Sequence, residues 1–323
     1  MTERENALRM INRTGDPGWV PLSWNCIISE GRYPSAMWER PKNGDGEDWF
    51  GCRWVLDKPT GGYVQDPRYG WPVTDITKWR EQVKFPDYEQ YDWAGCAAAD
   101  CSLHDRENCL VRFMVESGPF ERLHSLVGLE EAMISMYTEP EAFKELIEAI
   151  TDSKLKLIDK LAEYYHPDML CINDDLGSAG GPLISPEMYR EFIKPSHKRL
   201  VEAVRSHGII YIHHSCGHMQ AFIDDLIEIG VQVINPIQSM NDREYIARHY
   251  ADKVSFEICL STETDKLDVS EEVLRREVRE TIDIFGPAKN FILTPSLLAT
   301  ERGGQKMAII RDEAESYGRS YYK

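Results

Sequence analysis

The 323-residue sequence lacks any apolar run long enough to cross a lipid bilayer, which takes roughly 18 consecutive apolar residues. Its first 21 residues, MTERENALRMINRTGDPGWVP, also lack the apolar segment that is typical of a secretory signal. Both absences argue against a membrane protein or a secreted protein. We therefore expect the chain to be cytoplasmic and its eight cysteines to be thiols or metal ligands rather than disulfides.

Positive charge is also scarce, with 37 Lys and Arg residues against 54 Asp and Glu residues and a net charge of −17. Such a surface repels nucleic-acid phosphates, and no basic stripe offsets it. Nucleic acids are thus excluded as partners. The negative charge keeps the protein soluble and suits a basic patch on a protein partner.

Tryptophan is absent after residue 93, because all eight tryptophans lie at positions 19–93. We interpret residues 1–95 as an early strand followed by an irregular elaboration with a hairpin near 50–56, and residues 96–323 as the rest of a single barrel domain. The tryptophans either form a satellite core or homodimer contact, or line a pocket for an apolar substrate. Trp24, on a predicted strand, is the expected substrate-binding residue, with Trp38 and Trp54 as further candidates for an apolar wall.

From residue 109 onward, short apolar segments alternate with helical patterns, of which the longest spans 140–165. This rhythm predicts parallel strands joined by helical crossovers, and hence an α/β fold of the (β/α)8 TIM-barrel type. An open doubly wound sheet is less suitable, because no glycine-rich phosphate turn follows the first strand. Seven strands are predicted and the eighth is not evident; the seven are 20–27, 109–117, 168–172, 209–213, 231–235, 254–259 and 290–294.

The most distinctive motif is Ile212-His213-His214-Ser215-Cys216-Gly217-His218, directly after a predicted strand. Residues two apart at a strand end point the same way, so His214 and Cys216 are suited to bind one ion. An imidazole and a thiolate together favour Zn²⁺. The motif does not identify the third ligand: Cys259 is the first candidate and Glu257 is another.

Asp174 and Asp175 follow another predicted strand and precede a glycine-rich loop. Paired carboxylates in this position are suited to bind a metal, hold a substrate or donate a proton. We therefore predict Asp174, Asp175 and His214 as catalytic residues. Asn235, at the end of a further strand, is predicted to bind substrate.

With these motifs in their order, the chain resembles the uroporphyrinogen-decarboxylase-like superfamily. Within it, the chain is most similar to the corrinoid-dependent methyltransferases, including the methyltransferase component of O-demethylases. The resemblance is carried by the segments 48–55, 116–133, 172–200, 210–238 and 254–267.

The resemblance implies a zinc ion held by His-x-Cys and a later cysteine. His214 and Cys216 match the first two positions, but residues 294–300 near the last strand contain no cysteine. That departure argues against a thiol substrate and leaves Cys259, Glu257 or an aspartate to complete the site. O-demethylases also carry a Glu-x14-Glu-x20-His pattern, which Glu130, Glu145 and His166 fit.

The implied function is transfer of a methyl group from a small methylated donor, with a methoxylated aromatic compound favoured, to the Co(I) corrinoid (cobalamin) of a partner protein. The chain shows no cobalamin-binding motif of its own. A zinc ion or an aspartate would assist departure of the ether oxygen. A decarboxylase and a barrel that binds a corrinoid or another ligand without catalysis are the alternatives.

Overall fold

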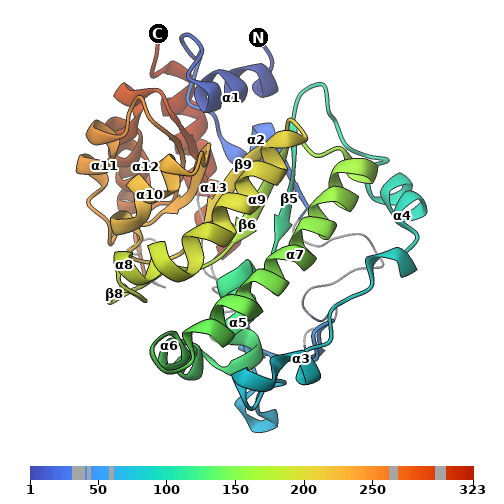
Figure 1. Cartoon of the computed structure of the whole chain (residues 1–323). Coiled ribbons are helices and arrows are strands. Elements are labelled where there is room, and N and C mark those ends of the chain that lie inside the picture. Colours follow the sequence, from blue (N-terminus) through green and yellow to red (C-terminus); the bar gives the residue numbers. More distant parts are fainter. Residues whose placement is uncertain (31–40, 42–44, 58–61, 262–267, 295–302) are drawn as a thin grey trace.

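The computed structural model describes the chain except residues 31–40, 42–44, 58–61, 262–267 and 295–302 (Figure 1). Its centre is a curled sheet of seven strands that all pair in parallel. The expected α/β barrel architecture is confirmed, and six of the seven predicted strands lie within two residues of their predicted bounds. In spatial order the strands are β1 (Ile27–Glu30), β5 (Leu110–Val115), β6 (Met169–Asn173), β9 (Ile210–His214), β10 (Val233–Ile237), β11 (Ser255–Ile258) and β12 (Phe291–Leu293).

The first predicted strand, 20–27, is wrong in its bounds. Leu22 forms a parallel bridge with Leu293 of β12, and then Ser23–Cys26 (α2) turns as a short helix before β1 begins. Hydrogen bonds from Trp24 and Asn25 to the carboxylate of Glu315 accompany this turn. The segment before β1 therefore lies beside β12, and it joins the two edges of the curled sheet.

Helices surround the sheet, and Figure 1 shows α7 and α9 lying side by side across its outer face. Ser185 and Ser270 begin their helices by accepting backbone N–H bonds, as expected for these residue types. The helices of the barrel are α5 (Pro119–Val127), α6 (Leu129–Thr138), α7 (Pro140–Tyr165), α8 (Pro186–Met188), a π-helical turn (Tyr189–Ile193), α9 (Lys194–Ser206), α10 (Ile223–Glu228), α11 (Arg243–His249), α12 (Glu271–Phe285) and α13 (Gly303–Ser320).

The barrel interior changes from apolar to polar along the strands. At the amino ends, α1 (Glu3–Asn12) closes the barrel, and Ser255 donates a hydrogen bond to the carbonyls of Met10 and Ile11. Toward the carboxyl ends the inward positions carry charged and polar side chains. The apolar layer consists of Ala7, Ile11, Cys26, Ile27, Leu110, Met169, Cys171, Ile210, Ile212, Val233 and Ile292.

The tryptophan-rich segment forms a small antiparallel sheet and two short helices. The strands are β2 (Gly46–Glu47), β3 (Arg53–Asp57) and β4 (Gly62–Gln65), followed by α3 (Trp79–Gln82) and α4 (Trp93–Asp100). This unit is anchored on α5, where Arg122 forms a fully buried ion pair with Asp48, and Asp48 also accepts the indole N–H of Trp54. Among the described helices, none has both the length and the apolar character needed to cross a membrane.

Candidate metal centre at the carboxyl ends of the strands

Three side chains converge where β6 and β9 end. The Nε2 atom of His214 lies 3.5 Å from the Sγ atom of Cys216 and 3.9 Å from an Oδ1 atom of Asp175. Within the described residues, this is the one group of three or more potential metal ligands whose donor atoms lie within 4.8 Å of one another. The predicted pair His214 and Cys216 is brought together, and Asp175 joins it as the third member.

The pairing of two neighbouring strands, and the loops that follow them, bring the three residues close together. Asn173 at the end of β6 pairs with His214 at the end of β9, so the loops that follow leave the sheet side by side. The backbone N–H of Asp174 donates to the carbonyl of His214 at 2.9 Å, and the N–H of Cys216 donates to Oδ1 of Asp175 at 2.7 Å. These bonds hold the two loops against each other.

Two glycines allow the same loops to cross at backbone contact. Gly217 has a φ of +78°, and a Cβ atom there would lie 2.5–2.7 Å from backbone atoms of Gly177 and Ser178. A Cβ atom on Gly177 would lie 2.7 Å from the backbone of His218. No larger residue fits at either crossing without moving the loops, so Gly177 and Gly217 permit the close approach of the loops that carry Asp175 and Cys216.

The donor set fits a zinc ion. Zinc bonds of roughly 2.0–2.3 Å to nitrogen and sulfur in a tetrahedral site place these donor atoms about 3.5 Å apart. The observed separation of 3.5 Å between His214 Nε2 and Cys216 Sγ agrees with this value. Three protein ligands leave one position open, as in catalytic zinc sites.

The surroundings of Cys216 oppose a free thiolate. Burial is the main cause that raises the pKa of its thiol, and the charges of Asp175, Cys259 and Glu121 raise it further. A bound divalent cation reverses this balance, because a coordinating thiol is deprotonated. Cys216 is therefore suited to act as a metal ligand rather than as a free nucleophile.

The structure separates the two adjacent aspartates. Asp174 is fully buried, and its oxygens accept the N–H groups of Phe120 and Glu121 at 3.0 and 2.6 Å, at the beginning of α5. It also lies 2.7 Å from Nε2 of His197 on α9. These contacts engage both oxygens of Asp174, and Asp175 is the aspartate that belongs to the group with His214 and Cys216.

Asn235 contacts His214 instead of pointing freely into the cavity. Its Oδ1 atom lies 2.6 Å from Nδ1 of His214, and its Nδ2 atom donates to Oε2 of Glu257 at 2.7 Å. Glu257, an alternative third ligand, is engaged by Arg112 through two hydrogen bonds. Cys259 is buried and lies outside the group of donor atoms, although its charge reaches Cys216.

The remaining candidates lie elsewhere. Trp24 packs on α13, where its indole donates to Glu315 and the guanidinium of Arg311 lies 5.6 Å from its ring. Trp54 is buried against Asp48, and Trp38 falls outside the described residues. The positions that fit the Glu-x14-Glu-x20-His pattern are exposed and do not form a group with each other; they are Glu130, Glu145 and His166.

Two residues of this region were not predicted from the sequence. His197 holds Asp174, and Glu121 accepts the backbone N–H of Asp175 at 3.2 Å. Both lie on helices that are distant in sequence from the aspartates, and neither belongs to a short motif. The one available signal was that both residues fall within segments that carry the family resemblance, 116–133 and 172–200, which does not assign either of them a partner.

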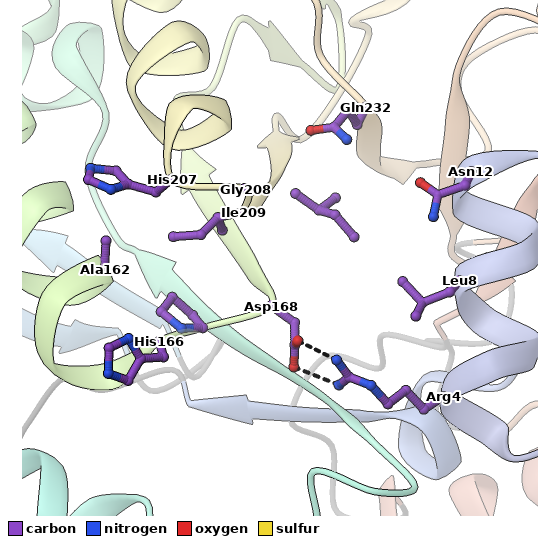
Figure 2. Close-up of a pocket in the computed structure, with 12 residues that line it drawn as sticks. Arg4, Leu8, Asn12, Ala162, His166, Asp168, His207, Gly208, Ile209 and Gln232 are labelled. Atoms are coloured by element: carbon purple, nitrogen blue, oxygen red, sulfur yellow. Dashed lines mark hydrogen bonds and ion pairs between the residues drawn. The ribbon is translucent and has the colours of Figure 1, made fainter.

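A polar cavity of about 460 Å³ lies at the opposite end of the barrel, at the amino ends of the strands. Figure 2 shows Arg4 of α1 paired with Asp168 at one side of it, with hydrogen bonds of 2.8 and 2.5 Å. His166 and His207 lie at another side of this cavity. Because barrel enzymes build their active sites at the carboxyl ends, this cavity is not the candidate site.

Comparison with known proteins gives consistent results. Residues 105–297 match the family model described as Uroporphyrinogen decarboxylase (URO-D). A methylated-thiol–coenzyme M methyltransferase of Methanosarcina mazei is 28% identical over 184 residues, which cover 56% of this chain and 47% of that protein. A uroporphyrinogen decarboxylase of Thermus thermophilus is 30% identical over 125 residues, covering 39% and 33%.

The matches span less than half the length of these curated relatives. A solved methyltransferase structure from Methanosarcina mazei superimposes with a TM-score of 0.71 and covers 98% of this chain and 99% of that chain, at 13% identity. That likeness shows the fold. Because the family model spans more than half of the sequence, the chain belongs to the uroporphyrinogen decarboxylase family.

Proposed function

We propose that this protein is a zinc-dependent methyltransferase that moves a methyl group from a small methylated donor to the Co(I) corrinoid of a partner protein. The observation that carries the proposal is the convergence of His214, Cys216 and Asp175 at the carboxyl ends of the strands. The similarity to a methyltransferase of Methanosarcina mazei supports the same reaction class.

The residues have separate roles in this proposal. His214, Cys216 and Asp175 would hold the ion, which supplies a Lewis acid for the heteroatom that loses its methyl group. The side chain of Asp175 is 34% exposed while its donor atom belongs to the ion site, so a small molecule can reach it from solvent. It is therefore suited to bind the metal or to hold a proton near the leaving group. The buried Asp174 fixes the start of α5 beside it.

A methoxylated aromatic donor is the finer part of the proposal. It follows from the resemblance to O-demethylases and from the absence of a cysteine at 294–300, where a thiol-specific site would have its last ligand. The tryptophans give it little support, because Trp24 and Trp54 contact α13 and Asp48.

A decarboxylase is the rival within the family. A substrate with several carboxylates requires cationic side chains in the cavity. Arg112, which the strands direct into the barrel, is already paired with Glu257. In the described part of the chain, the side chains in contact with His214 are instead acidic, thiol or amide groups, namely those of Asp175, Cys216 and Asn235.

The test combines metal analysis with methyl transfer. Unstripped protein should contain one zinc ion per chain, and the variants Cys216→Ser and His214→Ala should each lose it. The protein is then mixed with a Co(I) corrinoid protein and methoxybenzenes, methylamines, methanol or methylthiols, while the absorbance of methyl-Co(III) is followed. Transfer from methoxybenzenes supports O-demethylation. Transfer from another donor alone overturns the aromatic-ether assignment, and no transfer from any donor, with zinc unchanged in both variants, overturns the methyltransferase proposal.

A further inference from the structure

A line of hydrogen bonds descends from His214 into the barrel. Asn235 pairs with His214 in the parallel register of β10 and β9, so the two side chains lie next to each other. Nδ1 of His214 is 2.6 Å from Oδ1 of Asn235, and Nδ2 of Asn235 is 2.7 Å from Oε2 of Glu257. The line therefore ends on a carboxylate that is fully buried.

The carboxylate determines which way the Asn235 amide points. An ionised carboxylate only accepts hydrogen bonds, so the amide atom that faces Glu257 has to be the NH₂ group. The oxygen of Asn235 then has to face His214. An oxygen accepts only, and the ring nitrogen opposite it, Nδ1, has to carry the proton.

Glu257 is itself fixed on the other side. Nη1 of Arg112 donates to both of its oxygens at 2.8 and 2.7 Å, and the hydroxyl of Thr294 donates at 3.2 Å. Arg112 is anchored by two further bonds to the hydroxyl of Ser29. With Arg112 8% exposed and Glu257 0% exposed, water does not compete for these bonds. The carboxylate is thus held as an acceptor toward Asn235.

From this geometry we infer that Glu257 is a positioning residue that sets the tautomer of His214 through the amide of Asn235. With the proton on Nδ1, the Nε2 lone pair is bare and faces Sγ of Cys216 at 3.5 Å, as metal binding requires. A free imidazole in water prefers the opposite tautomer, with its proton on Nε2. The relay therefore prepares His214 for the ion before the ion binds.

The inference rests on the proposed function in one respect, because it takes His214 to be a metal ligand. Its direct consequence, the tautomer, is nevertheless measurable without metal, donor or corrinoid. A failure of methyl transfer and a failure of the relay can therefore be told apart.

The experiment is ¹⁵N NMR of metal-free protein labelled at its nine histidines, in which long-range couplings to the ring protons distinguish the two tautomers. His214 is assigned by the signal that disappears in His214→Gln. The wild-type ring should carry its proton on Nδ1. In Asn235→Leu and in Glu257→Leu the ring should shift toward the Nε2–H form, whereas Glu257→Gln, which keeps an acceptor for the amide, should retain the wild-type tautomer.

Glu257→Leu leaves Arg112 buried without its partner, which is destabilising in a protein interior. The double variant Arg112→Met/Glu257→Leu removes both charges and gives the same readout if the single variant does not fold. Zinc affinity, measured against a chromophoric chelator, should fall by roughly 10- to 100-fold in the folded Leu variants and stay near wild type in Glu257→Gln.

An Nε2–H tautomer in the wild type overturns the inference. So does an unchanged Nδ1–H tautomer in folded Glu257→Leu or Arg112→Met/Glu257→Leu, since Asn235 would then act alone. If the tautomers respond as expected and no donor yields methyl transfer, the relay stands and the proposed reaction is wrong.

Discussion

Replacing Gly217 with alanine tests whether the crossing of the two loops builds the metal centre. Gly217 lies next to Cys216, and its φ of +78° is strained for any residue with a Cβ atom. The added methyl group would also lie 2.5–2.7 Å from three backbone atoms of Gly177 and Ser178. Two effects are therefore expected, one from the backbone conformation and one from the collision.

Gly208→Ala separates these effects. Its φ of +74° is nearly the same, and nothing lies within 4 Å of its Cβ position. The left-handed conformation costs roughly 1–2 kcal/mol in either variant. Only Gly217→Ala also has to move the loop that carries Asp175, by about 0.9 Å if the closest contact of 2.5 Å is to reach the ordinary 3.4 Å. Metal sites tolerate ligand displacements of about 0.2 Å, so the collision should disrupt the site.

The assay has two parts. Urea unfolding in the presence of a chelator should show both variants destabilised, with Gly217→Ala losing more because its loops are pushed apart. Competition against a chromophoric chelator should show zinc affinity lowered on the order of 10- to 100-fold in Gly217→Ala and unchanged in Gly208→Ala. Equal zinc affinity in the two alanine variants would refute the argument that this close approach holds the ligands together.

Three further changes have expected outcomes. Asp175→Asn should slow methyl transfer by roughly 100-fold or more, the scale expected for a lost acid or ligand, as followed by stopped-flow absorbance of the corrinoid. A rate of methyl transfer equal to that of the wild type would show that Asp175 does not have this role. Burial lowers the pKa of Lys154 to about 7, so the folded state gains stability as pH rises from about 7 toward the ordinary value of 10.5. Lys154→Met should remove that dependence, and the difference in unfolding free energy between variant and wild type should shrink by roughly 2–3 kcal/mol from pH 6 to pH 9; a constant difference contradicts it. Arg122→Met, which leaves Asp48 buried without its cation, should cost about 3–5 kcal/mol in urea unfolding, and Arg122→Met/Asp48→Leu should cost less.

The regular part of the fold was predictable from local pattern. Strands β5, β6 and β9 to β12 are short apolar segments, and α7 follows the helical repeat from Pro140 to Tyr165. These signals are local, because a strand alternates every two residues and a helix repeats every 3.6. The first strand was misjudged because its apolar pattern continues through Ser23–Cys26, where contacts with the distant α13 accompany a helical turn.

The pairing of His214 with Cys216 was also predictable from the sequence, because side chains two residues apart at a strand end point in the same direction. The third member of the group, Asp175, could not be selected from the sequence. Asp174 and Asp175 are adjacent and must diverge, but the sequence does not say which one faces the barrel mouth. That choice depends on the start of α5 and on His197 of α9, which bind Asp174 and leave Asp175 to Cys216.

The same holds for Asn235, whose position at a strand end indicated substrate contact. Parallel register places it beside His214, and the next strand places Glu257 below it, so its amide is used within the protein. Strand ends and their polar residues were therefore determined by the sequence itself. Which of those residues touch each other was decided only by the tertiary structure, because strand register and helix docking join residues that are distant in the chain.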